Sequence, residues 1–569
     1  MVRACTSIVC TWFVWSLIYY GYLGFGWYVP LEYVLDNLTD VSKSRWIVRV
    51  YEVLLLGLVA MFFGWLGGWR QVWRRYAAPA LKRLWDDPAP EQLGPASPGG
   101  PALWSELRAA GAHAAADRLV SDARSGSMND VDFVRIAHVW AMVRIGRMPM
   151  ADFTDTVLRL GAAAWTHPSG ARDLPQRTAA HDLMTGQVRI GTVVQGPGDT
   201  PARGGFGLAL SPAELGTSAL AIGPSRSGKT SQLVRPVTEA LCLQALARTA
   251  TIITVGTGTE PAVPDDAFDI IIRLGDPRSL RDFDIYGGTH DSQQAASILA
   301  EALVGDLTST VGPIAHSVPR AATALAELLG PFRAVHHRFP QVPELQELLS
   351  GNQDAIDSLR NALEAAGQDA YLRVLDKSSR ETNAGEIIRA LLRDRIAILE
   401  PLLAPRTHAR PFLLGAALQE PQRIRIDLPT SGLAEASDVA ARLVLAQFNI
   451  YAATRPDQTA FAFLVLDVAA RAITTGSLHG VQRLRSAHAG VLLTLQLLDD
   501  IAESLHFPLL ETVGCLVCWP GLSPRDTQRI NDKRPNPYLT SSTPSDLSLV
   551  SMPSDHKNMA APFLARLHS

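Results

Sequence analysis

The sequence predicts an α/β fold: an open, mainly parallel sheet that is interrupted by an inserted all-α domain and preceded by two N-terminal transmembrane helices. Three observations predict this architecture. Short apolar runs typical of buried strands alternate with helical patterns on both sides of a long insertion. The insertion, residues 291–418, reads almost entirely as helix. Two long uncharged segments precede residue 70.

Length and composition set the outer limits. The chain has 569 residues, too many for one compact core, so we expect two or three domains with connecting pieces. Its hydrophobic share of 47% and mean hydropathy of +0.09 are high for a wholly soluble protein. The net charge of −3 does not point to a nucleic-acid binder.

The N-terminal segment, residues 1–85, is predicted to be a membrane anchor. Its spans are expected at about 5–29 and 50–69, where no charge interrupts the apolar sequence for most of each length. The alternatives are a signal peptide for the first segment and a buried helix for the second. Basic residues gather directly after Trp69, so the positive-inside rule predicts a multi-pass protein of the cell membrane with its N-terminus and main body in the cytoplasm.

The remaining chain divides by composition. We expect a Pro/Gly linker at 86–102, a helical region at 103–185, a core in two parts at 186–290 and 419–531, and a flexible tail at 532–569. Core strands are predicted at 187–194, 207–210, 218–222, 249–255, 269–274, 423–428, 461–466 and 490–496. Helices are expected at 231–248, where Pro236 should kink the helix without ending it, and at 437–453.

Residues 223–230 read GPSRSGKT, the G-x-x-x-x-G-K-[ST] pattern of a phosphate-binding loop between a strand and a helix. In such a loop backbone N–H groups face the phosphates, a lysine reaches the β- and γ-phosphates, and a hydroxyl binds Mg²⁺. The alternative is a glycine-rich turn without a ligand. The pattern predicts a nucleotide site for ATP with Mg²⁺, formed by Gly223, Pro224, Ser225, Arg226, Ser227, Gly228, Lys229 and Thr230.

The second half of the site is predicted at later strand ends. Asp467 closes the apolar strand FAFLVL and is a candidate Mg²⁺ ligand beside Thr230; otherwise it is an ordinary turn residue. Val468 stands where a water-polarising glutamate is usual, and valine can neither accept a proton nor orient water. Gln496 ends the strand GVLLTL and could contact the γ-phosphate or simply cap the strand.

Two further groups of residues are candidates for a role in the site. Arg485, with Arg483 and Arg471, is a candidate arginine finger acting on a neighbouring subunit, the alternative being a solvated surface arginine. Cys515 and Cys518 form a C-x-x-C within an apolar run, and without a second pair they are expected to be core thiols rather than a metal site.

The order of these features resembles the coupling proteins of type IV secretion and conjugation, the TraG/TraD-like membrane ATPases. Two spans, GPSRSGKT, a helical insertion, LVLD and RLRSAHAGVLLTLQ carry the resemblance over about residues 1–530, nearest to an actinobacterial branch of ATP-binding membrane proteins. It implies a RecA-like P-loop NTPase core, with Lys229, Asp467, Gln496 and Arg485 as catalytic candidates. Two departures weaken the implied turnover: Val468, and ITVGTGTE at 253–260 in place of an Asp-Pro-Lys-Gly-Glu-like turn.

The resemblance also implies a hexameric ring at the membrane that moves DNA or protein into a secretion channel. Two alternatives remain open at this stage. The chain could be a nucleotide-binding scaffold with little hydrolysis, or a DNA pump of the FtsK/HerA type.

Overall fold

The computed structural model describes residues 10–14, 16–17, 54, 56–59, 61–62, 104–179, 181–195, 204–257, 261–309, 317–378, 383–403, 410–429, 432–467, 469–470, 472–534, 547–552 and 563–568. The chain divides into two compact units, Met1–Gln92 and Leu93–Ser569. The predicted linker at 86–102 lies outside the described residues.

In the first unit, the described residues are short helical pieces within the two predicted spans. Most of 5–29 and 50–69 falls outside the described part of the chain. Among the residues that are described, none belongs to a helix with the length and apolar character needed to cross a bilayer. Both spans therefore stay predictions.

The centre of the second unit is a parallel sheet with the strand order β12-β4-β11-β10-β5-β9-β6. Its middle strands are buried along their whole length, because helices cover both faces and leave no polar side. Six of its seven strands were predicted, each within one or two residues of the observed bounds, and the strand at Cys515–Cys518 was not predicted. The strands are β4 (Ala219–Ile222), β5 (Ala250–Thr257), β6 (Ile270–Arg273), β9 (Arg423–Leu428), β10 (Phe461–Leu466), β11 (Ala489–Leu495) and β12 (Cys515–Cys518).

An antiparallel extension continues the sheet beyond β12, in the order β12-β13-β14-β2-β1, with β3 paired to β2. The prediction of a flexible tail over 532–569 was wrong for its two strands. Leu549 and Val550 of the first strand, and Leu564, Ala565 and Leu567 of the second, are buried where these strands pair with β12 and β2. The helical region also ends earlier than residue 185, since β1 pairs with β2. These elements are β1 (His181–Asp182), β2 (Gln187–Val194), β3 (Gly207–Leu210), β13 (Ser548–Ser551) and β14 (Phe563–Leu567).

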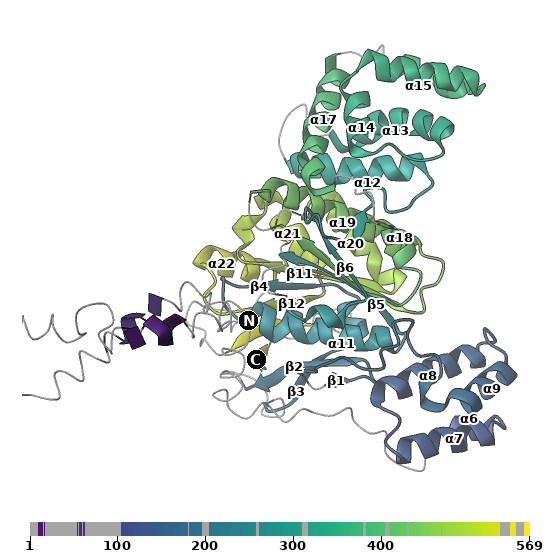
Figure 1. Ribbon diagram of the computed structural model, residues 1–569, viewed down its shortest axis with the longest axis vertical. Helices are drawn as coiled ribbons and strands as arrows, with labels where there is room; N and C mark the ends of the chain where they lie inside the picture. The colour runs from purple at the N-terminus through teal and green to yellow at the C-terminus, as the bar shows by residue number, and fades with distance from the viewer. Residues whose placement is uncertain are drawn as a thin grey trace, which may run out of the picture. The chain divides into compact units, whose positions relative to one another are not determined.

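Helices cover both faces of the sheet (Figure 1). One face packs against α11 (Arg235–Leu246), whose side chains join those of β4, β5 and β10 in one hydrophobic core. The other face packs against α19 (Ala434–Thr454) and α20 (Thr475–Leu484) in a second core. Smaller helices at this level are α10 (Pro212–Leu215), α18 (Leu414–Ala417), α21 (Glu503–Thr512) and α22 (Pro524–Lys533).

Between residues 291 and 403 the regular elements of the described chain are all helices, as predicted, and Figure 1 shows them stacked together beyond α19. The predicted all-α range of 291–418 extends too far, because residues 410–412 form a strand. Strands β7 (Arg281–Phe283) and β8 (Arg410–Phe412) pair in parallel where the chain enters and leaves it. Pairing the two connections fixes the insertion at its base. Its helices are α12 (Ser292–Val304), α13 (Ser317–His336), α14 (Val342–Leu349), α15 (Gln353–Ala365), α16 (Asp369–Ser378) and α17 (Asn383–Leu403).

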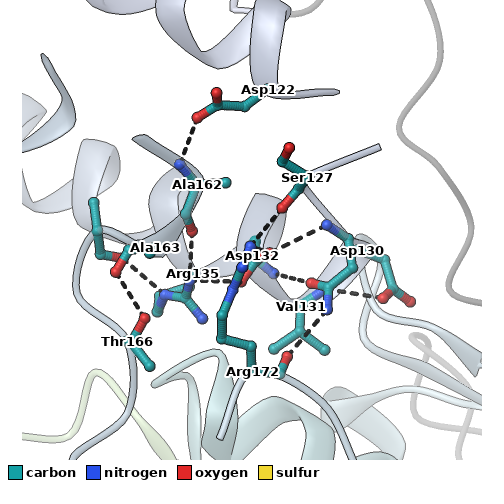
Figure 2. Close-up of polar contacts among 12 residues, drawn as sticks. Asp122, Ser127, Asp130, Val131, Asp132, Arg135, Ala162, Ala163, Thr166 and Arg172 are labelled. Carbon is teal, nitrogen blue, oxygen red and sulfur yellow. Dashed lines mark hydrogen bonds and ion pairs between the residues drawn. The ribbon is translucent and has the colours of Figure 1, made fainter. Parts of the chain in front are cut away.

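A small helical region precedes the core and is closed by a buried ion pair (Figure 2). The side chains of Asp132 and Arg135 are fully buried, with 2.6 Å between Oδ1 and Nη2. Arg135 also donates to the carbonyl oxygens of Ala162 and Ala164 at 2.8 and 2.9 Å, and Arg172 donates to Asp132. These bonds satisfy charges that would otherwise be costly to bury. The helices are α6 (Ser105–Ala109), α7 (His113–Arg124), α8 (Asp130–Arg144) and α9 (Met150–Leu160).

Candidate functional site

The loop of residues 223–229 connects β4 to the helix that leads into α11, the strand–loop–helix order expected from its sequence. Two of its glycines are required by space. A Cβ on Gly223 would lie 2.6 Å from the Cβ of Trp519, and one on Gly228, at φ +98°, would lie 2.9 Å from Gln232. Glycine therefore lets this loop fold tightly over the strand end and bring its backbone N–H groups together.

The first turn after the loop, Thr230–Val234, is a π-helix, with the Arg235 N–H donating to the carbonyl oxygen of Thr230. We attribute this π-helical turn to Pro236. It has no N–H to offer the carbonyl four residues earlier, so the regular hydrogen-bond ladder cannot start there. The helix continues past Pro236 as α11, so the proline does not end it, as predicted.

Lys229 lies half-buried in the loop. Its Nζ donates to the carbonyl oxygens of Gly223 and Pro224, the latter at 2.8 Å. Burial lowers the pKa of Lys229, while the negative charges of Asp467 and Asp500 act in the opposite direction. An ammonium group held by neutral carbonyls in a partly desolvated site favours an anionic ligand.

Asp467 follows β10 directly, and its Oδ1 accepts a hydrogen bond of 2.9 Å from Thr494 Oγ1 on β11. Burial raises the pKa of Asp467 despite the lowering effect of Thr494, of the Lys229 charge and of the Thr230 side chain. The two predicted Mg²⁺ ligands, Thr230 and Asp467, thus lie close enough to interact. Hydroxyl and carboxylate oxygens are the ligands that Mg²⁺ prefers, so this pair fits the ion.

One buried hydroxyl of the loop is positioned to hydrogen-bond a phosphate oxygen. Ser227 Oγ is buried and finds no hydrogen-bond partner among the residues that the structure describes. A buried hydroxyl without a partner is costly, and a phosphate oxygen in the loop would supply one.

Lys229, Thr230 and Asp467 line a single cavity of about 600 Å³ at the carboxyl edge of the parallel strands. The predicted loop members Gly223, Pro224, Ser227 and Gly228 are not among its lining residues. Parallel strands end at the same edge, which is why residues far apart in sequence meet there. The predicted members Ser225, Arg226, Lys229, Thr230, Asp467 and Gln496 all line it. Thr494, Asp499 and Asp500 line it as well and were not predicted.

Arg485 and Arg483 are not in this cavity. Arg485 is exposed in the short 3₁₀ helix Arg485–Ala487, which precedes β11, and Arg483 is exposed at the end of α20. Strand β11 runs for seven residues from this end to Gln496, so Arg485 lies at the opposite edge of the sheet. A role on a neighbouring subunit stays a prediction. Arg471 and Val468 lie outside the described residues.

Trp519 is the main structural residue of the site that the sequence analysis missed. It follows β12, is 1% exposed, and donates from Nε1 to Gln232 Oε1 at 2.8 Å. Its backbone N–H donates to the Ile222 carbonyl oxygen at 2.8 Å. Trp519 thus lies against the loop from the neighbouring strand. The apolar run GCLVCW was interpreted only as the site of two core thiols, and nothing local indicated a strand that pairs with β4.

Cys515 and Cys518 are core thiols, as expected. Both are buried in β12, one in each of the two hydrophobic cores on opposite faces of the sheet. Burial raises the pKa of each thiol to about 12. Side chains on opposite faces of a strand cannot share a metal ion.

No protein-family model and no curated protein sequence matches the chain. The chain is similar in structure to conjugative coupling proteins. The coupling protein TrwBdeltaN70, in an unbound form, has 14% identity and a TM-score of 0.47 over 63% of this chain and 87% of its own. TrwB in complex with ADP and Mg²⁺ has 16% identity and a TM-score of 0.45 over 67% and 94%. VirB4 of Thermoanaerobacter pseudethanolicus has 10% identity and a TM-score of 0.42 over 67% and 96%.

Proposed function

We propose that the protein is a membrane-anchored ATPase of the coupling-protein type, which binds ATP with Mg²⁺ at this cavity and couples binding and hydrolysis to the movement of DNA or protein. One observation carries the proposal. Lys229, Thr230, Asp467 and Gln496, predicted separately from the sequence, line the same cavity at the carboxyl edge of the sheet.

Each residue has a part that its position supports. The N–H groups of the loop and the Lys229 ammonium bind the phosphates, and the lysine exchanges its carbonyl partners for phosphate oxygens. Thr230 and Asp467 hold Mg²⁺, which neutralises phosphate charge when bound. Gln496 is exposed at the end of β11, where its amide can contact the γ-phosphate or orient a water molecule.

The wider assembly follows from the sequence resemblance and belongs to the same proposal. A homo-oligomeric ring, a hexamer by that resemblance, would lie at the cytoplasmic face of the cell membrane, anchored by residues 1–85. DNA–protein substrates and components of a secretion channel are the partners that this arrangement implies.

A second function is favoured by Val468. Where the sequence lacks the usual glutamate, the site could bind nucleotide tightly and turn it over poorly. The protein would then act as a nucleotide-dependent scaffold, with the same cavity and the same ligands.

The test of the first proposal uses the full-length protein in detergent or nanodiscs and compares wild type with Lys229→Ala. We expect nucleotide affinity and steady-state ATP turnover to fall together, turnover by at least about 100-fold, because the lysine contacts the transferred phosphate. Lys533→Ala is the matched control, since Lys533 pairs with Glu511 on the protein surface.

The outcomes separate the two functions. Turnover that is equal in wild type and Lys229→Ala would exclude this loop as its source. Tight binding in the wild type with no turnover, lost in Lys229→Ala, would support the scaffold.

A further inference from the structure

Hydrolysis at this cavity requires a group that takes a proton from the attacking water. Val468 cannot do so, and the amide of Gln496 can orient water but is not a base. The question is therefore which carboxylate of the cavity is available. Within the described part of the chain, three line it: Asp467, Asp499 and Asp500.

Two of the three are engaged. Asp467 accepts a hydrogen bond from Thr494 and is placed to bind Mg²⁺ together with Thr230. Asp499 forms an ion pair with Arg529 of α22, and this contact lowers the pKa of Asp499. A carboxylate that is paired with a guanidinium is a poor proton acceptor.

Asp500 is the remaining carboxylate. It ends the short 3₁₀ helix Leu498–Asp500, four residues after Gln496, and its Oδ2 accepts a hydrogen bond from the Leu497 N–H at 2.9 Å. That bond orients the carboxylate. The other oxygen has no hydrogen bond from the residues that the structure describes.

The surroundings of Asp500 suit a water-handling residue. Asp500 also lines a second, polar cavity of about 390 Å³, which shares Ala470 with the first and contains Arg395 and Arg442. Asp500 thus borders both cavities. Its charge acts on Lys229 together with that of Asp467, so it lies within electrostatic reach of the phosphate-binding group.

We propose that Asp500 replaces the missing glutamate and activates the attacking water, with Gln496 orienting it. The inference rests on the proposed ATPase function. In the step, a water oxygen forms a bond to the γ-phosphorus while the bond between that phosphorus and the β–γ bridging oxygen breaks. The water proton passes to the Asp500 carboxylate, ADP and inorganic phosphate leave, and Asp500 releases the proton to solvent.

The test is Asp500→Asn in the full-length protein. Asparagine keeps a carbonyl oxygen for the Leu497 N–H but is no base, so we expect kcat to fall by about 100-fold or more. The affinities for ATP and ADP, measured by calorimetry, should change by less than about 3-fold. The unfolding midpoint should stay close to that of the wild type.

Two comparison variants sharpen the result. Asp499→Asn changes the neighbouring carboxylate that Arg529 already holds, and it should retain most of the turnover. Adding Val468→Glu to Asp500→Asn places a base at the usual position, and recovery of turnover would support the proposal. The inference would be overturned by wild-type kcat in Asp500→Asn, by an equal loss in Asp499→Asn, or by loss of ATP affinity in parallel with kcat.

This inference and the ATPase proposal fail in different ways. If Lys229→Ala loses turnover but Asp500→Asn keeps it, only the role of Asp500 is wrong. If wild type and Lys229→Ala turn over ATP equally, the ATPase proposal itself fails.

Discussion

At the scale of single residues, burial makes the ionisation of the Asp467 carboxylate depend on the positive charges around it. This carboxylate is largely desolvated, and the hydroxyls of Thr494 and Thr230 together with the charge of Lys229 do not fully offset that cost. Bound Mg²⁺ would supply the missing positive charge. The ion should therefore bind best when Asp467 is already ionised.

We expect a pH dependence of Mg²⁺–nucleotide binding from this residue. Burial raises the folded-state pKa of Asp467, so protonation competes with Mg²⁺ at a higher pH than for an exposed aspartate, and affinity falls as the pH is lowered through that raised pKa. Titration of a non-hydrolysable ATP analogue between about pH 4.5 and about pH 8 measures it.

Asp467→Asn is the control for this dependence. Because the phosphates titrate in the same range, the variant records their contribution alone, and the difference between the two profiles belongs to Asp467. Identical profiles in both proteins would contradict a Mg²⁺ role for this side chain.

At the scale of elements, the loop is shaped by its neighbours as much as by its own sequence. Strand β12 presents Trp519 against Gly223 and Gln232, and Glu301 of α12 accepts a hydrogen bond from Thr474 at the start of α20. The second contact ties the insertion to the segment that follows Asp467. The elements around the cavity are therefore held by contacts that no single motif encodes.

Trp519→Phe should loosen the loop without unfolding the sheet. Phenylalanine keeps most of the buried ring but removes the Nε1–H group that donates to Gln232, and a partly buried amide oxygen then loses its partner. We expect nucleotide affinity to weaken by about 5- to 30-fold, the equivalent of about 1–2 kcal/mol, as measured by calorimetry.

Gln232→Met in the Trp519→Phe background should add little further loss, since both changes remove the same hydrogen bond. Fully additive losses from the two substitutions would show that the bond does not position the loop.

At the scale of the whole molecule, the C-terminal segment of the second unit extends the central sheet. β14, near the C-terminus, pairs with β2, and β13 pairs with β12, which borders the strand that carries the phosphate loop. The segment that composition marks as a tail thus covers an edge of the parallel core. Covering that edge also removes a strand that other chains could pair with.

Val550→Ala tests the structural role of this segment. Val550 is fully buried in β13, so the substitution should lower the free energy of unfolding by about 2 kcal/mol, measured by chemical denaturation. Removing Ser569 alone, beyond both strands, serves as the control. A Val550→Ala protein as stable as the wild type would contradict the pairing of this tail with the core.

The sequence by itself determined the features that depend on local pattern. Apolar runs located the six predicted parallel strands of the core, and helical spacing located the insertion. The motif GPSRSGKT, together with Asp467 and Gln496, located residues that line the cavity. The two membrane spans were also predicted from local pattern, and they stay predictions because most of their residues lie outside the described part of the chain.

Only the tertiary structure decided which distant residues meet. The strand order places β4 between β11 and β12, so that Trp519 contacts the loop and Asp500 lines the cavity. The same sheet includes two strands from the segment predicted to be a flexible tail. The physical reason is that parallel strands share one carboxyl edge, while their order depends on long-range packing that the local pattern does not record. Arg485 shows the same limit, because its position at the far edge follows from strand direction and not from its neighbours in sequence.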